Sequence, residues 1–332
     1  MRRVCNRAIA VLAVGLASPA LAAEMGSAPV STGLFATLDG GYLDLDQDDV
    51  FGHAVNPSGV AGAPVDDVRI SPEDGWFIGG SAGYRSNAPL ISFLPFNRWE
   101  AYLTYSESDE EERDSVSGAA SIDLNNVDAT TLATIGGTGS TGIERRTWEF
   151  GTRSAVDTGA PGRSSVTWVM QSFTRYSEEE TESFAVGTAD RASRSADVET
   201  TSTGMMLLAE PEHWLSPSLA LVGRAGVGVY YYDIEGEFRS SSSAVPDVFA
   251  ARISDDDDGF GFRAQLGAGV KLRLGAASTL TGYAEADYLS DVGTAGLPDN
   301  NLATVTPAEV DTSDAWEFRA GARLSVGLGS GQ

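Results

Sequence analysis

The sequence has very little cysteine, lysine or histidine. Cys5 is the only cysteine, Lys271 is the only lysine, and the histidines are His53 and His213. A chain that loses Cys5 with a cleaved N-terminal segment has no thiol, which excludes disulfides, cysteine zinc sites and thiol nucleophiles. Basic residues are also scarce, since 22 Lys and Arg stand against 47 Asp and Glu, for a net charge of −25. So acidic a chain is not expected to bind nucleic acid, whose phosphates require a basic surface.

The N-terminus has the pattern of an export signal. Arg2, Arg3 and Arg7 precede an apolar stretch at 9–16 that is too short to span a bilayer as a helix. The small residues Ala20 and Ala22 follow at the spacing of a cleavage site. We therefore predict a cleaved signal peptide at 1–22 and a single mature domain at 23–332. No later apolar run reaches the length of about 18 residues that a transmembrane helix needs.

Alternation of apolar and polar residues predicts β-strands with two different faces. In 260–274 the even positions are apolar, whereas the odd positions include Arg263, Lys271 and Arg273. The segment 314–328 repeats the pattern, with Glu317 and Arg319 on its polar face. Ten such strands are predicted: 34–46, 75–85, 97–107, 143–155, 163–176, 200–210, 218–236, 259–274, 278–290 and 314–328.

Long and short connections alternate between these segments. The long ones are 47–74, 108–142, 177–199, 237–258 and 291–313, and the short ones are 86–96, 156–162, 211–217 and 275–277. This alternation is typical of an antiparallel up-and-down transmembrane barrel with long outer loops, short periplasmic turns and both termini in the periplasm. We predict an all-β barrel of about ten strands in a Gram-negative outer membrane. A hairpin within 108–142 would raise the count to twelve, and a secreted or periplasmic β-sandwich is the alternative fold.

The predicted outer loops and the polar strand faces differ in charge. Without the three arginines of 1–22 the net charge is −28, and the five long connections carry −24 of it. The polar strand faces are mixed with a basic excess, and they must line the lumen because charges cannot face lipid cheaply. The predicted lumen-lining residues are Arg98, Glu100, Glu149, Arg153, Arg224, Arg263, Lys271, Arg273, Glu285, Asp287, Glu317, Arg319 and Arg323.

Two functions are compatible with this interior. In the first, the lumen is a narrow porin-like channel for small solutes or ions, with a weak anion preference. In the second, Arg–carboxylate pairs bridge the interior, and the barrel is a structural or adhesive protein whose acidic loops bind cations, lipopolysaccharide or a partner. Ten strands enclose little space, whereas the glycines on the inner face leave room. The first function is our leading hypothesis, and the oligomeric state is left open.

Neither an enzyme nor a strong metal site is predicted. The acids Asp46, Asp48 and Asp49 and the run Asp255, Asp256, Asp257 and Asp258 offer ligands for loosely bound Ca²⁺ or Mg²⁺, without the pattern of an EF-hand. No other cofactor is predicted. A barrel with acids around one outer histidine resembles the omptin proteases in gross layout, but their paired Asp–Asp and Asp–His elements cannot be placed. His53 is interpreted as a solvated loop residue.

The organisation resembles Gram-negative outer-membrane β-barrel proteins over essentially the whole mature chain. The phrases at 148–151 (WEFG), 284–289 (AEADYL) and 316–321 (WEFRAG) look like strands of the pore-forming family that includes the Legionella major outer-membrane protein. The resemblance implies a pore-forming role. The partners it implies are outer-membrane lipid, lipopolysaccharide and the barrel assembly machinery, although the chain departs from many such barrels by continuing past Leu328 without a terminal aromatic residue.

Overall fold

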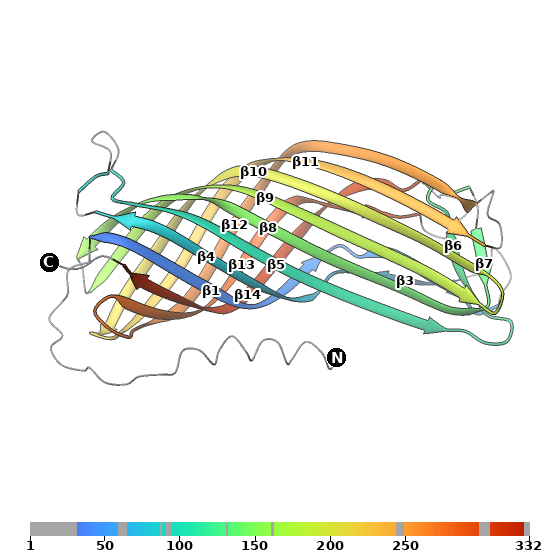
Figure 1. Ribbon diagram of the computed structural model, residues 1–332, viewed down its shortest axis with the longest axis horizontal. Helices are drawn as coiled ribbons and strands as arrows, with labels where there is room; N and C mark the ends of the chain where they lie inside the picture. The colour runs from blue at the N-terminus through green and yellow to red at the C-terminus, as the bar shows by residue number, and fades with distance from the viewer. Residues whose placement is uncertain are drawn as a thin grey trace.

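A computed structural model of the chain describes residues 32–58, 65–86, 88–90, 95–130, 132–160, 163–243, 249–298 and 306–328. These residues form a closed antiparallel barrel of ten strands and a separate four-stranded sheet (Figure 1). In spatial order the barrel strands are β1 (Gly33–Gln47), β14 (Glu309–Gly327), β13 (Ser278–Gly296), β12 (Ala251–Arg273), β11 (Leu219–Ser242), β10 (Arg191–Ser216), β9 (Ser164–Gly187), β8 (Gly137–Ala160), β5 (Arg98–Ser115) and β4 (Asp74–Arg85). The barrel closes because β1 pairs with both β14 and β4. The predicted signal peptide at 1–22 lies outside the described residues.

All ten predicted strands are present in the barrel, which confirms the fold and a count of ten rather than twelve. Apolar residues on the strands face outward and polar residues face the lumen, as the alternation in the sequence predicts. Phe262 is exposed on the outer wall of β12, whereas the next residue, Arg263, is buried inside. No helix among the described residues is long and apolar enough to cross a membrane.

The strands extend much further outward than predicted. β8, β9 and β11 are each 24 residues long and β10 is 26. The prediction of long acidic loops is therefore wrong for much of the chain, because most of the segment 177–199 lies on paired strands. Hydrophobic alternation gave no signal here since both faces are polar, with Glu178 and Glu180 outside and Glu179 and Thr181 buried inside. The backbone pairing of β9 with β8 and β10 nevertheless continues through this segment.

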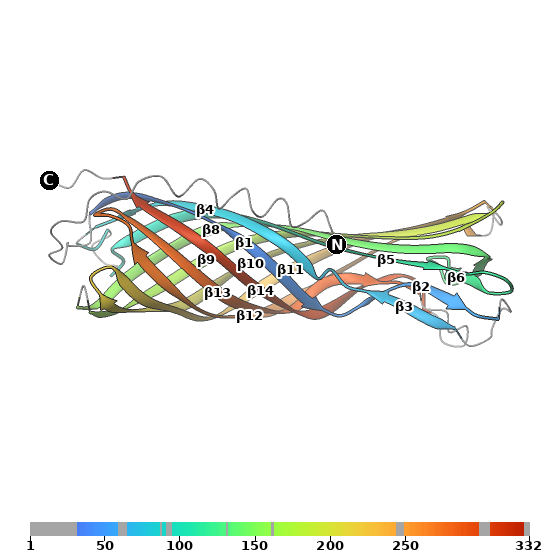
Figure 2. The same cartoon turned by 90° about the horizontal axis from the view of Figure 1, so that it is seen from below.

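The second sheet comes from the first two predicted loops. It contains β3 (Asp66–Ile70), β2 (Val50–Asn56), β6 (Ser121–Asn125) and β7 (Leu132–Ile135) in that order. It lies at the outer end of the molecule, beside the long barrel strands (Figure 2). Ile122, Leu124 and Ile135 form a buried apolar cluster with Ala185 of β9 and Ala192 of β10. The predicted second loop thus packs its hairpin against the inner face of the wall.

The outer wall has an apolar band bounded by two levels of aromatic residues. At the outer level the ring of Tyr105 lies 4.4 Å from Trp148, centroid to centroid. At the inner level Tyr84 and Trp99 are directly opposite in the β4–β5 register. Large apolar side chains between the levels are exposed, including Leu103. Aromatic girdles around an exposed apolar band are the signature of a transmembrane barrel, so this band is the surface that meets lipid.

Candidate functional site

All thirteen predicted lumen-lining residues lie on the inner face of the barrel. Eleven of them border one cavity at the end of the barrel where the short turns lie, and the other two, Asp287 and Glu317, are buried further toward the outer end. The alternation therefore indicated the face of each strand on which these charges lie. It gave no information on which of them would touch.

Ion pairs cross the interior near its middle. Arg263 of β12 donates to Glu149 of β8 at 2.8 Å, although three barrel strands separate β12 from β8 on the shorter side. Arg175 of β9 pairs with Glu317 of β14, and four strands lie between them in either direction. These contacts are made straight across the barrel rather than along its wall.

Further contacts fix this set of residues. Arg263 also donates to Asp287 on the neighbouring strand, with Nε and Oδ1 3.0 Å apart, and the Tyr102 hydroxyl donates to Glu149 at 2.9 Å. We call Tyr102, Glu149, Arg175, Arg263, Asp287 and Glu317 the transverse layer. Only 1% of the Arg263 side chain and 7% of the Glu149 side chain are exposed. Charges so deeply buried need partners, and here each has one.

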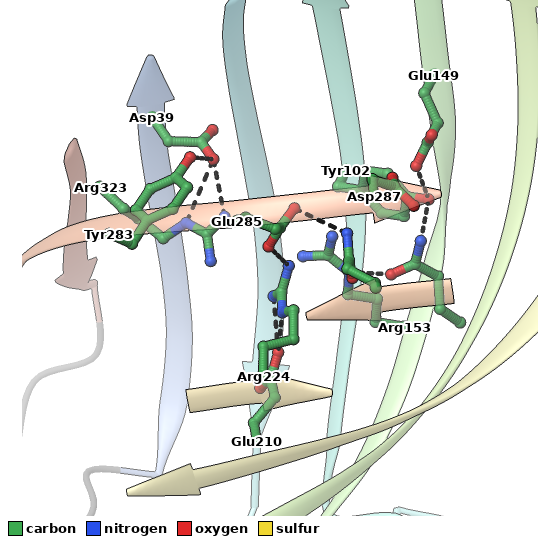
Figure 3. A network of polar contacts seen from close by, with 12 residues as sticks. Asp39, Tyr102, Glu149, Arg153, Glu210, Arg224, Tyr283, Glu285, Asp287 and Arg323 are labelled. Carbon is green, nitrogen blue, oxygen red and sulfur yellow. Dashed lines mark hydrogen bonds and ion pairs between the residues drawn. The ribbon is translucent and has the colours of Figure 1, made fainter. Parts of the chain in front are cut away.

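A second group of paired charges lies between the transverse layer and the turns (Figure 3). Arg224 joins Glu210 at 2.7 Å to Glu285 at 3.1 Å. Arg153 with Glu100 at 3.0 Å and Arg323 with Asp39 at 2.8 Å are two more pairs of this group. They border a cavity of about 770 Å³. We call this cavity the vestibule.

His53 is not the solvated loop residue that we predicted. It lies on β2 and is fully buried, with Nδ1 2.8 Å from the Thr141 hydroxyl of β8 and Nε2 3.1 Å from Asp114 of β5. Folding of the first loop into a strand against the wall removes the imidazole from water. Burial lowers the pKa of His53 below its usual 6.5, while Asp114 opposes that shift and the nearby Arg194 adds to it. The neutral form is therefore favoured.

Arg194 is a second buried group at this end that sequence reasoning missed. Its guanidinium donates to the main-chain oxygens of Phe51, at 2.9 Å, Gly52 and Pro298, and it lies 4.8 Å from the centre of the Phe51 ring. Burial lowers the pKa of Arg194 to about 9. This side chain ties β2 to the inner face of β10.

The acids predicted to bind cations do not form a compact site. Asp255 to Asp258 lie on β12, where successive side chains point to opposite faces. Asp46 is exposed near the end of β1, whereas the next residue, Gln47, is buried. Among the described residues, no group of three or more His, Cys, Asp or Glu side chains is arranged to hold a metal ion.

Acidic residues instead form two rows around the outer wall, and Arg146 of β8 interrupts one of them between Glu107 and Glu178. The rows follow the cross-strand register of β5, β8, β9, β10, β11 and β12. We call these ten residues the acidic belt: Glu107, Asp109, Glu144, Glu178, Glu180, Asp197, Glu199, Glu235, Glu237 and Asp256. Burial and neighbouring carboxylates raise the pKa of Glu180 and that of Asp197.

Comparisons with known proteins identify the fold alone. No family model matches the chain, and no curated protein matches it. Solved structures do match. The outer membrane protease OmpT of Escherichia coli covers 91% of this chain and 100% of its own at 8% identity and a TM-score of 0.48. The match to the outer membrane protein OprG of Pseudomonas aeruginosa covers 90% of this chain and 98% of OprG, at 11% identity and a TM-score of 0.26. The match to Ail of Yersinia pestis covers 88% of this chain and 99% of Ail, at 10% identity and a TM-score of 0.23.

This chain is a transmembrane β-barrel. The girdled apolar band and the closed sheet establish the barrel. The closer resemblance to the family of the Legionella major outer-membrane protein is not confirmed by these comparisons.

The prediction that the protein is not an enzyme has to be withdrawn. The protease OmpT aligns over 91% of this chain, so this architecture does not exclude catalysis. An Asp–His contact, which could not be placed from the sequence, is present, because His53 Nε2 lies 3.1 Å from Asp114. At 8% identity the likeness concerns the fold and assigns no activity to this chain.

Proposed function

We propose that the protein is an outer-membrane barrel with a closed lumen, whose tall outer wall is a binding surface on the cell exterior. The transverse layer is the observation that supports a closed lumen. Its ions contact each other across the barrel at hydrogen-bond distance and are almost fully buried. Solutes could pass only if these pairs separated, and breaking one costs several kcal/mol, on the order of 3–5 kcal/mol.

The acidic belt supports the second half of the proposal. It lies directly above the outer aromatic girdle, where Tyr105 donates to Glu107 at 3.1 Å and Tyr231 donates to Asp258 at 2.9 Å. This is the level of lipid headgroups. Lipopolysaccharide is anionic, so it would be repelled by the belt unless divalent cations lay between them. We infer that Mg²⁺ or Ca²⁺ bridges the belt to lipopolysaccharide phosphates.

Like charges opposite each other in a sheet destabilise it, by roughly 0.2–1 kcal/mol a pair. Glu180 faces Asp197, and Asp197 in turn faces Glu237. Bound cations would offset this repulsion.

A planar bilayer containing the purified protein tests the closed lumen. We expect no discrete conductance steps in KCl, because the transverse layer blocks the passage. A variant that removes both crossing pairs, with Glu149, Arg175, Arg263 and Glu317 each replaced by serine, should conduct, and it shows that the assay detects an opened lumen. Regular conductance steps in the unmodified protein would contradict the proposal.

A gated version of the predicted narrow channel is the second candidate. The vestibule favours it, because a cavity of about 770 Å³ already lies in the lumen at the end with the short turns. Steps that appear only under applied voltage would support this candidate over the closed barrel.

The cation bridge has its own expected result. Millimolar Mg²⁺ should raise the unfolding midpoint of the protein in lipopolysaccharide-containing vesicles more than NaCl of equal ionic strength. The double variant Glu180→Gln, Asp197→Asn should lose most of this difference and gain stability in EDTA, since its repulsion is gone. Asp311→Asn, an exposed acid of β14 outside the belt, is the matched control. If Mg²⁺ raises the unfolding midpoint equally in the double variant and in Asp311→Asn, the cation bridge is ruled out.

A further inference from the structure

The vestibule has the size and position of a ligand site. Its volume of about 770 Å³ lies within the usual range for small-molecule sites, roughly 300–1,000 Å³. Its deep end is bounded by Glu149 and Arg263 of the transverse layer, and its mouth by the turns at 214–217 and 275–278. In an up-and-down barrel these short turns lie in the periplasm. A ligand would therefore enter from that side.

The lining of the vestibule is basic in an otherwise acidic protein. Nine Arg and Lys side chains border it against seven Asp and Glu, an excess of two positive charges. The rest of the chain is strongly negative, with −25 over its full length. Because low-dielectric walls strengthen the field of enclosed charges, an anion is favoured over a cation in this cavity.

The polar atoms left without partners point to the same class of ligand. The Nε–H groups of Arg85, Arg98 and Arg319 are buried and have no hydrogen-bond acceptor among the described residues. Arg98 donates to Glu210 through Nη2 at 3.4 Å, whereas its Nε is 4.0 Å from Oε2 of Glu100. Among the residues that line the vestibule, the only buried acceptor without a donor is Gln265 Oε1. Guanidinium N–H groups only donate, so what is missing is an acceptor.

Arg273 at the mouth is available to meet such a ligand. Its guanidinium stacks 4.4 Å from the centre of the Trp214 ring. Unlike Lys271, which pairs with Glu212, it has no carboxylate partner among the described residues. A stacked guanidinium keeps its fork of donors in a fixed plane, which suits the two oxygens of a phosphate or a carboxylate.

We propose that the vestibule binds a small multivalent anion that carries phosphate or carboxylate groups and enters from the periplasm. Arg273 contacts it at the mouth together with Arg85, whose present partner is Asp157 at 3.3 Å. This site needs no open lumen. It is therefore independent of the closed barrel and of the acidic belt.

Isothermal titration calorimetry of the folded protein in a zwitterionic detergent at low salt tests the site, with pyrophosphate and citrate as probes. We expect one molecule of at least one probe to bind. Pyrophosphate alone would identify phosphate as the preferred group, and citrate alone would identify carboxylate. The double variant Arg85→Gln, Arg273→Gln should weaken binding by at least about tenfold, which corresponds to the loss of a charge-assisted hydrogen bond.

These two arginines are at the partly exposed mouth, so the variant is expected to fold, and its heat-modifiable migration on a gel checks this. Arg113→Gln removes an exposed arginine from the outer wall and should leave binding unchanged. The proposal is overturned if neither probe binds, if the double variant binds as tightly as the unmodified protein, or if Arg113→Gln weakens binding equally.

Discussion

Replacing Arg263 with glutamine should destabilise the barrel by about 3–5 kcal/mol, the cost of removing one partner from a buried ion pair. The guanidinium joins Glu149 to Asp287, and both carboxylates are buried. Without it, two buried negative charges remain within one layer of the lumen. Urea unfolding of the protein in lipid vesicles, followed by tryptophan fluorescence, measures the difference.

Two variants serve as comparisons for Arg263→Gln. Arg113 makes an exposed pair with Glu111 on the outer wall, so Arg113→Gln should cost less than about 1 kcal/mol. Glu149→Gln should be milder than Arg263→Gln, because Arg263 keeps Asp287 and the Tyr102 hydroxyl keeps an acceptor. If Arg263→Gln costs no more than Arg113→Gln, the layer is hydrated, and the lumen is open enough to conduct.

The inward position of Arg263 was predictable from sequence, but its partners were not. Strand alternation is a local property, so β12 reveals its two faces in a short stretch of residues. Contact with Glu149 depends instead on the number of strands and on the register around the ring, and 114 residues separate the two positions in the chain. Hence the sequence could not exclude the bridged interior, although the narrow channel was the leading hypothesis.

The outer half of the barrel escaped prediction for a different reason. In the outer half of β9 the wall carries charge outside and small or polar residues inside, such as Ser183 and Ala185, and this pattern resembles a loop. Its core is supplied by Ile122 and Leu124, which belong to another sheet. Strand pairing in this region is stabilised by partners that no local pattern identifies. His53 was misjudged for the same reason, because its contacts with Asp114 and Thr141 exist only once β2 has docked.

Arg194 should control whether β2 stays docked. It is 1% exposed and supplies donors to three main-chain oxygens, so Arg194→Met should leave these carbonyls unpaired at a cost of about 1–3 kcal/mol each. The barrel itself should stay folded, because Arg194 lies near the outer end of β10 and does not contact the strand ends beside the short turns. We expect selective opening of β2 and β3. Trypsin measures it directly, since Arg69 is the only Lys or Arg between residues 47 and 74.

Cleavage after Arg69 should accelerate by about tenfold or more, because proteolysis follows the population of the opened segment. Arg191→Met alters an exposed arginine on the same strand and should not change the rate. Unchanged cleavage in Arg194→Met would show that β2 is held by its apolar contacts alone.

Acid should open β2 as the Arg194→Met substitution does. The pKa of His53 is lowered in the docked state, so below about pH 6.5 the opened form binds a proton that the docked form resists. Hydrogen exchange of β2, corrected for its intrinsic pH dependence, should therefore be faster at pH 5.5 than at pH 7.5, and Asp114 together with Glu112 limits the size of this effect.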